Sequence, residues 1–278
     1  YVVTEAGFGA EMGAEKMMHI KATASGVSPD CVVINVTVRS MKMHGGGFST
    51  GGGKRPRPEE VAKENVEAVR AGANTNMARH IRNMSRFGVP VIASVNVFPT
   101  DTEAEIEVLL DEAREAGAAD AVVTRVHSDG GEGGADLARA VVTACQSHIA
   151  EGRPFEPLFG PNAPLEEKIL RIATNVYGAA SIDLAPKALN ELKTLQNWGY
   201  GNLAVCMAKT QYSFSHEMKE IGAPSGFTLP IRDLRLNAGA GFIVAICGTM
   251  MTMPGLPRIP AGENMDMDED GNLLGMFR

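Results

Sequence analysis

The stretch CVVINVTV, residues 31–38, is a continuous run of apolar and β-branched residues, and two more runs of this kind follow it. They are PVIASVNV at residues 90–97 and DAVVTRV at residues 120–126. Strands without polar alternation are covered on both faces, which is typical of parallel sheets. Segments with helical periodicity lie between these runs, so the sequence predicts an α/β fold with a largely parallel sheet and right-handed crossovers.

The segments between the expected strands have clear helix signals. Residues 58–88 begin with Pro58 and two acidic residues and carry apolar side chains at helical spacing. In the next segment Thr102 precedes Glu105 by three residues, which is a capping box, and Gly117 provides a stop. Residues 152–164 then form a loop in which several prolines interrupt any regular element, and this loop indicates a domain boundary. The final third is richer in strands, with the runs NLAVCMAK, FTLPIRDLRLN and GFIVAICG.

Composition excludes several classes of protein. The chain has 278 residues, 44% of them hydrophobic, and a net charge of −7, which argues against general nucleic-acid binding. No apolar run reaches the ~18 residues needed to span a bilayer, so we expect no membrane partner. The four cysteines form no CxxC pair and lie mostly in apolar runs, as thiols do in a reducing compartment. We therefore expect a cytoplasmic protein without a bound metal. Because the first residue is Tyr1 and YVVTEAG reads as a strand end, we also expect the chain to begin within a longer protein.

Three glycine-dense turns follow expected strands, at the edge where α/β sheets bind ligands. They are residues 4–16, 42–55 and 128–136. None is a phosphate-binding P-loop: GxxxxGK[ST] would need Gly and Ser or Thr where the second turn has Phe48 and Arg55. Beside this turn, the basic residues are consistent with an anion site, as phosphoryl chemistry requires, or with a solvated basic loop. They are Arg39, Lys42, His44 and Lys54.

Phe98, Pro99 and His127 lie at the ends of neighbouring expected strands. An aromatic face, a rigid ring and an imidazole at one edge could form a slot for a flat heterocycle. Phe98 could equally cover the core above its own helix. Farther along, a set of polar residues after the run NLAVCMAK is suited to ligand contacts: Lys209, Gln211, Tyr212 and Ser213.

Together these stretches resemble formate:tetrahydrofolate ligase, also called 10-formyltetrahydrofolate synthetase. TEAGFGAEMGAEK is similar to the family segment TEAGFGAD-x-GAEKF, and VTVRSMKMHGGG to its signature VAT[IV]RALKxHGG. Five further segments match in the same order: VNVFPTDTEAE, GGEGG, CMAKTQYSFS, NAGAGFIVAICGTMMTMPGLP and DEDGNLLGMF. The resemblance covers essentially the whole chain and implies the C-terminal half of a family member.

The resemblance implies an ATP-dependent, ADP-forming ligase that joins formate to tetrahydrofolate through formyl phosphate, with Mg²⁺ accompanying ATP. It implies a P-loop NTPase type of sheet with additional α/β domains: residues 1–76 as the end of the nucleotide-binding domain, 77–164 as the folate platform and 165–278 as a C-terminal domain. We also expect a homo-oligomer. The implied residues are, for catalysis, Arg39, Lys42, His44, Gly45 and Gly46; for folate, Phe98, Pro99 and His127; and for nucleotide, Glu5, Gln211, Tyr212 and Ser213.

Two departures from the family pattern bear on activity. His127 stands where many members have a second stacking Trp, which offers a smaller ring face. The chain also lacks the family's P-loop, so we expect it to be inactive without an N-terminal half supplied in cis or in trans. The alternative is a noncatalytic folate-binding or assembly module that has lost the ATPase half.

Overall fold

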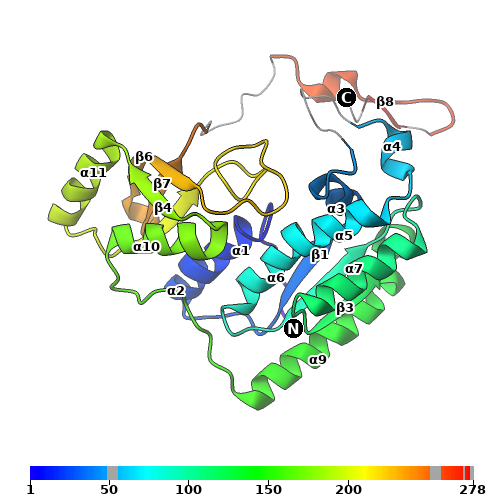
Figure 1. The fold of residues 1–278 in the computed structure, drawn as a ribbon, viewed down its shortest axis with the longest axis horizontal. Helices are drawn as coiled ribbons and strands as arrows, with labels where there is room; N and C mark the ends of the chain where they lie inside the picture. Colours follow the sequence, from blue (N-terminus) through cyan, green and yellow to red (C-terminus); the bar gives the residue numbers. More distant parts are fainter. Residues whose placement is uncertain (49–55, 251–257, 272, 276–278) are drawn as a thin grey trace. The chain divides into compact units, whose positions relative to one another are not determined.

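The computed structural model describes residues 1–48, 56–250, 258–271 and 273–275 (Figure 1). By backbone proximity the chain forms two compact units, Tyr1–Gly248 and Thr249–Arg278. The first unit contains two sheets, each with its own hydrophobic core. The α/β class predicted from the alternating pattern is confirmed. The three-part division of the chain stays a prediction.

The first sheet has the order β1-β2-β3 and is parallel throughout. Its strands are β1 (Val32–Val36), β2 (Val91–Asn96) and β3 (Asp120–Thr124). The strand pairs are joined by helical crossovers, as the sequence predicts. β1 and β2, which come from the apolar runs at residues 31–38 and 90–97, are direct neighbours in the sheet.

Helices cover the two faces of this sheet unequally. One face packs against α6 (Ala78–Ser85) and α7 (Glu103–Glu115), with α5 (Val66–Gly72) packed against α7, and the core here includes Ile34, Val95 and Leu109. On the other face α9 (Ala135–Glu151) packs mainly on β2 and β3. The helices that cover the first face are visible above the sheet in Figure 1, with α9 below it.

Local hydrogen bonds decide where two of the expected strands end. β1 stops at Val36 because Thr37 caps α3 (Val38–His44), its hydroxyl accepting from the Ser40 amide at 3.2 Å. β3 stops at Thr124 because the Arg125 amide turns to donate to the Gly133 carbonyl at 3.0 Å. Both strands are thus shorter than the apolar runs indicate. Residues 1–6, expected to end a strand, are extended and exposed but form no strand in the described structure.

The second sheet is mixed, with the order β4-β6-β7-β5. β4 (Ser181–Leu184) and β6 (Thr228–Asn237) are parallel, β6 and β7 (Phe242–Cys247) antiparallel, and β7 and β5 (Ala204–Ala208) parallel. α10 (Leu165–Ile172) and α11 (Pro186–Asn197) cover it. This sheet is built from the strand-rich final third of the sequence.

The remaining elements are short. In the first unit they are α1 (Gly13–Lys16), η1 (Met17–Lys21), α2 (Ala22–Ser25), α4 (Pro58–Ala62), η3 (Ala73–Met77), α8 (Val126–Asp129), η4 (Gly130–Gly134), η5 (Ala173–Tyr177) and η6 (Ala238–Ala240). The second unit contains η7 (Ala261–Asn264) and a small antiparallel pair, β8 (Asp266–Met267) and β9 (Leu273–Leu274). Within the described ranges, no helix has the length and apolar character needed to cross a membrane.

Candidate active site

The turn that presents Phe98 is built by its own polar residues. Asp101 accepts a hydrogen bond from the Phe98 amide through Oδ2 at 2.9 Å, while the Asp101 amide donates to the Phe98 carbonyl at 3.0 Å. Thr102 and Glu105 then cap α7 reciprocally, at 3.4 and 3.3 Å. Pro99 lies exposed within this turn. Phe98 is thus held at the carboxyl end of β2 by a rigid, local hydrogen-bond network.

The Phe98 ring is available to a ligand. It is 37% exposed, whereas Phe87 of the neighbouring core is fully buried. The guanidinium carbon of Arg39, from the first turn of α3, lies 5.4 Å from the centre of the Phe98 ring. An Arg at this distance interacts favourably with an aromatic face and orients it. The structure therefore brings together two of the residues singled out in the sequence, one cationic and one aromatic, at the carboxyl ends of adjacent parallel strands.

Lys42, on the same helix, points inward. Its ammonium group lies 2.8 Å from Glu105 Oε1 and donates to the carbonyls of Val61 and Lys63 at 3.0 and 2.9 Å. Lys42 is 1% exposed and Glu105 is fully buried. In this structure Lys42 therefore ties α3 to α7 and to the α4–α5 connection, and it acts on the Phe98 turn through Glu105.

His44 is the last residue of α3, and its ring is held by the loop that precedes β6. Its Nδ1 accepts a hydrogen bond at 3.0 Å from the amide of Gly222. Burial, followed by the repulsive effect of His80, lowers the pKa of His44 to about 4, although Glu11 opposes the shift. A neutral imidazole that accepts at Nδ1 carries its proton on Nε2. His44 is thus built as a hydrogen-bond donor through Nε2.

Two glycines after His44 are required by close packing and by backbone conformation. A Cβ added at Gly45 would lie 1.8 Å from the Ala68 carbonyl oxygen, so only glycine lets α3 lie against α5. Gly46 has φ +77°, in the left-handed region that favours glycine. Both glycines therefore have a structural reason to be present, and their contact with a phosphoryl group stays a prediction.

His127 lies outside the strand that the sequence predicts for its neighbours. It is exposed on α8, in the turn that closes when Arg125 donates to Gly133. A Cβ at Gly133 would lie 2.5 Å from the Arg125 carbonyl carbon, which explains one glycine of the GGEGG segment. The stacking role of His127 stays a prediction.

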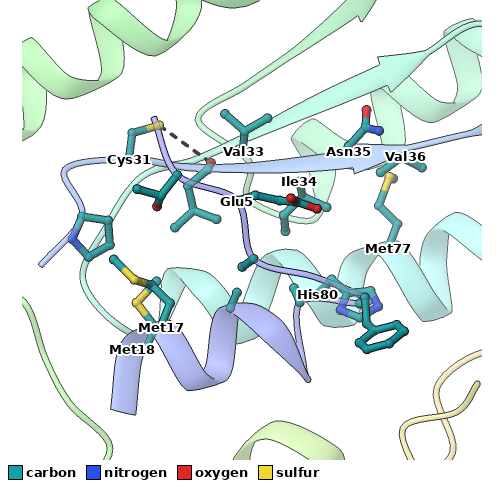
Figure 2. A pocket seen from close by; sticks show the side chains of 18 of the residues that line it. Glu5, Met17, Met18, Cys31, Val33, Ile34, Asn35, Val36, Met77 and His80 are labelled. Carbon is teal, nitrogen blue, oxygen red and sulfur yellow. Dashed lines mark hydrogen bonds between the residues drawn. The ribbon is translucent and has the colours of Figure 1, made fainter. Parts of the chain in front are cut away.

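A cavity of about 820 Å³ lies between β1 and residues 3–10 (Figure 2). Glu5 enters it from the N-terminal segment, and His80 lines it from α6. Its remaining wall is largely apolar, including Ile34, Met18 and Met77. The exposed Glu5 carboxylate is therefore the charged group that the first glycine-dense turn presents to this cavity.

Behind the cavity lies a buried charged cluster that the sequence analysis did not assemble. Lys209 is fully buried, with Nζ 3.5 Å from Glu11 Oε1 and 4.9 Å from the centre of the Tyr177 ring. It donates to the carbonyls of Thr210 and Ser213. The only hint in the sequence was a lysine immediately after an apolar run, since its acidic partner lies in the first glycine-dense turn.

Burial dominates the electrostatics of this cluster. It lowers the pKa of Lys209, opposed by the attraction of Glu11, and it lowers the pKa of His80, again opposed by Glu11. Glu11 Oε2 and His80 Nδ1 are 3.7 Å apart, and neither atom has a hydrogen-bond partner among the described residues. Glu11 thus faces Lys209 through Oε1 and His80 through Oε2.

The predicted nucleotide residues 211–213 lie on the turn that Lys209 holds. Tyr212 is 61% exposed, Gln211 is half-buried and Ser213 is buried. The Ser213 hydroxyl lies 3.3 Å from the Ser215 hydroxyl and accepts from the Ser215 amide at 3.0 Å. Tyr212 is therefore the most accessible of the three, while Ser213 shapes the turn.

The fold and this site define an α/β protein with an aromatic platform and basic side chains at the carboxyl edge of a parallel sheet. Comparison with known proteins specifies the family. The model of the family described as "Formate--tetrahydrofolate ligase" matches residues 1–277, and the chain belongs to this family.

Curated relatives agree with this assignment. The chain is 48% identical over 277 residues to "Formate--tetrahydrofolate ligase" from Paracoccus denitrificans, covering 100% of this chain and 47% of the relative. The protein of the same name from Roseiflexus castenholzii is 48% identical over 276 residues, covering 99% of this chain and 48% of the relative. "C-1-tetrahydrofolate synthase, cytoplasmic" from Schizosaccharomyces pombe is 46% identical, with 29% of its length covered. The chain thus spans about half the length of the bacterial relatives.

Proposed function

We propose that this chain provides the folate platform and part of the acyl-transfer site of an ATP-dependent formate:tetrahydrofolate ligase. The observation that carries the proposal is the family match, which extends over residues 1–277. The exposed Phe98 ring, oriented at the carboxyl edge of the parallel sheet, supports it. Family membership and an accessible aromatic platform together favour a role in the ligation.

In the proposed reaction, formate attacks the γ-phosphoryl group of ATP and displaces ADP. N10 of tetrahydrofolate then attacks the formyl carbon of the resulting formyl phosphate, displacing phosphate and losing its proton. Phe98 stacks against the pterin ring, which Pro99 and His127 help to confine. Arg39 supplies positive charge beside the ring, and the Nε2 proton of His44 is available to a phosphoryl oxygen. Lys42 positions this machinery through Glu105.

Nucleotide contacts are assigned to Glu5 and to the turn that contains Gln211, Tyr212 and Ser213. Glu5 lines the 820 Å³ cavity, and Lys209 fixes the turn by its bonds to Thr210 and Ser213. A rigid turn with an exposed tyrosine can offer its ring to a base at little entropic cost. Tyr212 is the proposed contact to the nucleotide ring.

The phosphates of ATP and the accompanying Mg²⁺ are assigned to the part of a family-length ligase that this chain does not span. No GxxxxGK[ST] sequence occurs in the 278 residues, so the lysine and hydroxyl that such a loop supplies must come from elsewhere, in cis or in trans. We propose that the chain alone does not turn over, and that the complete enzyme is a cytoplasmic homo-oligomer.

Formylation with purified proteins tests this function. The chain is assayed for 10-formyltetrahydrofolate formation from ATP, formate and tetrahydrofolate, alone and together with the separately expressed, unmatched part of the P. denitrificans relative. Product that requires both polypeptides and ATP supports the ligase. Tetrahydrofolate binding without product in any combination would favour the noncatalytic module. The absence of both tetrahydrofolate binding and product would overturn the proposed platform itself.

A further inference from the structure

Three arginines lie along one face of α6. Arg79, Arg82 and Arg86 are spaced by three and four residues, and Arg86 directly follows the last residue of the helix with its backbone still helical. Side chains at this spacing leave a helix on the same side. Between the first and the last of them the helix rises by about 10 Å. The three guanidinium groups therefore form a basic row, which we call the α6 arginine row.

Two of these guanidinium groups are held in place by neutral partners. The guanidinium carbon of Arg79 lies 5.4 Å from the centre of the Phe214 ring, and a Cβ at Gly178 would collide with Nη1 of Arg79. Arg86 donates through Nη1 to the backbone carbonyl and the side-chain oxygen of Asn175, at 2.8 and 3.1 Å. An aromatic ring, a glycine and an amide orient the two groups, but they bring no negative charge to them.

No carboxylate of the described residues forms an ion pair with any member of the α6 arginine row. Glu156 comes near its end, with Cγ 3.7 Å from a Cβ placed at Gly88, yet it forms no ion pair with Arg86 in the described parts of the chain. Arg82 is exposed and makes no hydrogen bond or ring contact with the residues described. This is unusual in a chain whose net charge is −7, because acidic side chains outnumber basic ones.

The three charges repel one another. Burial, followed by the repulsion of Arg82 and Arg86, lowers the pKa of Arg79, although a guanidinium stays protonated in a protein. The carbonyl end of a helix favours basic side chains only within its last turn. That effect accounts for Arg82 and Arg86 but not for Arg79, which lies farther from the end of α6. A bound anion would relieve the repulsion and compensate the partly buried charge of Arg79.

We propose that the α6 arginine row binds a small linear polyanion, with two or more phosphate or carboxylate groups. Guanidinium groups pair with both kinds of oxyanion in bidentate geometry. Neighbouring positions of the row are roughly 5–6 Å apart, so a single phosphate cannot reach all three arginines, whereas a chain of anionic groups can. Because the rest of the chain is acidic, a long polyanion such as nucleic acid would be repelled beyond this face.

This site goes beyond the proposed ligation and does not depend on it. Its three arginines have no part in the folate platform or in the phosphoryl chemistry assigned to Arg39 and His44. Phe214 follows the turn assigned to the nucleotide, so the α6 arginine row borders that turn without belonging to it. Formylation and polyanion binding can therefore be measured, and can fail, separately.

Calorimetric titration of the whole chain at low ionic strength tests the site. The probes are tripolyphosphate, citrate and inorganic phosphate. We expect tripolyphosphate to bind saturably, and inorganic phosphate to bind about tenfold or more weakly by comparison, since it engages fewer guanidinium groups. Arg82→Gln should weaken tripolyphosphate binding about tenfold, because it removes one charge-assisted contact. The side chain of Arg82 has no contact to lose, so this variant keeps the fold.

Arg139→Gln is the matched control. Arg139 is an exposed arginine on α9, with a side chain 73% exposed, and the variant should bind tripolyphosphate like wild type. Arg79→Gln, checked for folding by its urea midpoint, should weaken binding at least as much as Arg82→Gln. Citrate that binds as tightly as tripolyphosphate would support a site for polyanions of both kinds, and a preference for tripolyphosphate would support a polyphosphate site.

Equal affinities of the Arg82→Gln and wild-type chains for tripolyphosphate would overturn the site. Equal losses in Arg82→Gln and Arg139→Gln would also overturn it, because binding would then follow the net charge and not the α6 arginine row. Inorganic phosphate that binds as tightly as tripolyphosphate would contradict the polyanion, and the absence of saturable binding by both tripolyphosphate and citrate would overturn the proposal entirely.

Discussion

The amide of Gly222 donates a hydrogen bond to Nδ1 of His44 at 3.0 Å, joining the loop before β6 to the end of α3. The loop is also held by Asn76, whose side-chain amide donates to the Gly222 carbonyl at 3.0 Å. Gly222 has φ +74°, and a Cβ there would lie 3.3 Å from the Thr75 hydroxyl. The orientation and tautomer of His44 are therefore set by a segment far away in the sequence.

This relationship predicts the tautomer of His44. In ¹⁵N-histidine NMR spectra at pH 7, Nδ1 of His44 should have the shift of an unprotonated nitrogen and Nε2 that of a protonated one. The ring should remain neutral well below pH 6, because its pKa is lowered to about 4. His44→Gln serves to assign the signal. A ring that titrates near its ordinary value of ~6.5 would contradict the buried, accepting geometry.

The same shift predicts a pH dependence of stability. The unfolded chain binds a proton at His44 near pH 6.5, and the folded chain only near pH 4, so unfolding is favoured as pH falls through this window. Stability present above about pH 6.5 should decrease toward pH 4, by up to roughly 1.4 kcal/mol per pH unit from this group. Urea unfolding of wild type and His44→Gln at several pH values measures the difference. The variant should show a shallower dependence, with His80, whose pKa is also lowered, accounting for part of what remains.

Lys42 and Glu105 predict a stability effect that an exposed pair would not give. Removing one partner of a buried ion pair costs about 3–5 kcal/mol, because the other charge is left uncompensated. Lys42→Met should reduce the free energy of unfolding by this order in chemical denaturation. Arg139→Met is the control: Arg139 is 2.5 Å from Asp136, but both side chains are exposed, and the expected loss is below about 1 kcal/mol. Similar losses in the two variants would show that the contribution of Lys42 to the free energy of unfolding does not depend on its burial.

The sequence predicted the strands better than the direction of individual side chains. Apolar runs and a capping box located β2 and α7, since these features depend on neighbouring residues, whereas the residues alone left Phe98 open between a ligand slot and a cover over its own helix, and its folate role stays a prediction. Lys42 was interpreted with Arg39 and His44 as part of one basic group, yet it points to Glu105, and no local pattern encodes a contact between α3 and α7. The Lys209–Glu11 pair was missed for the same reason. Residues 49–55, with the second half of the glycine-rich turn, lie outside the described residues.

Phe98 provides the sharpest test of the platform. In the complex with the unmatched part of the relative, Phe98→Ala should weaken tetrahydrofolate binding by ~1–3 kcal/mol, taking the stacking of a base on an aromatic ring as the analogue. ATP binding should be nearly unchanged. Trp198→Ala removes an aromatic side chain that is 67% exposed at the end of α11, and it should affect neither ligand. Calorimetric titration measures both affinities. Equal losses for tetrahydrofolate and ATP would mean that Phe98 supports the fold instead of the ligand.

Lys209 offers a final test, of the turn assigned to the nucleotide. The ammonium group donates to two carbonyls of the turn and faces Glu11, so Lys209→Met removes the support of residues 210–213 and leaves Glu11 buried without its cation. Amide exchange in peptides covering residues 210–215 should accelerate, and nucleotide affinity in the reconstituted complex should fall while tetrahydrofolate affinity holds. Lys219→Met, at an exposed position in the same loop region, is the matched control. Faster exchange without a change in nucleotide affinity would mean that this turn does not bind the nucleotide, and that Lys209 has only a structural role.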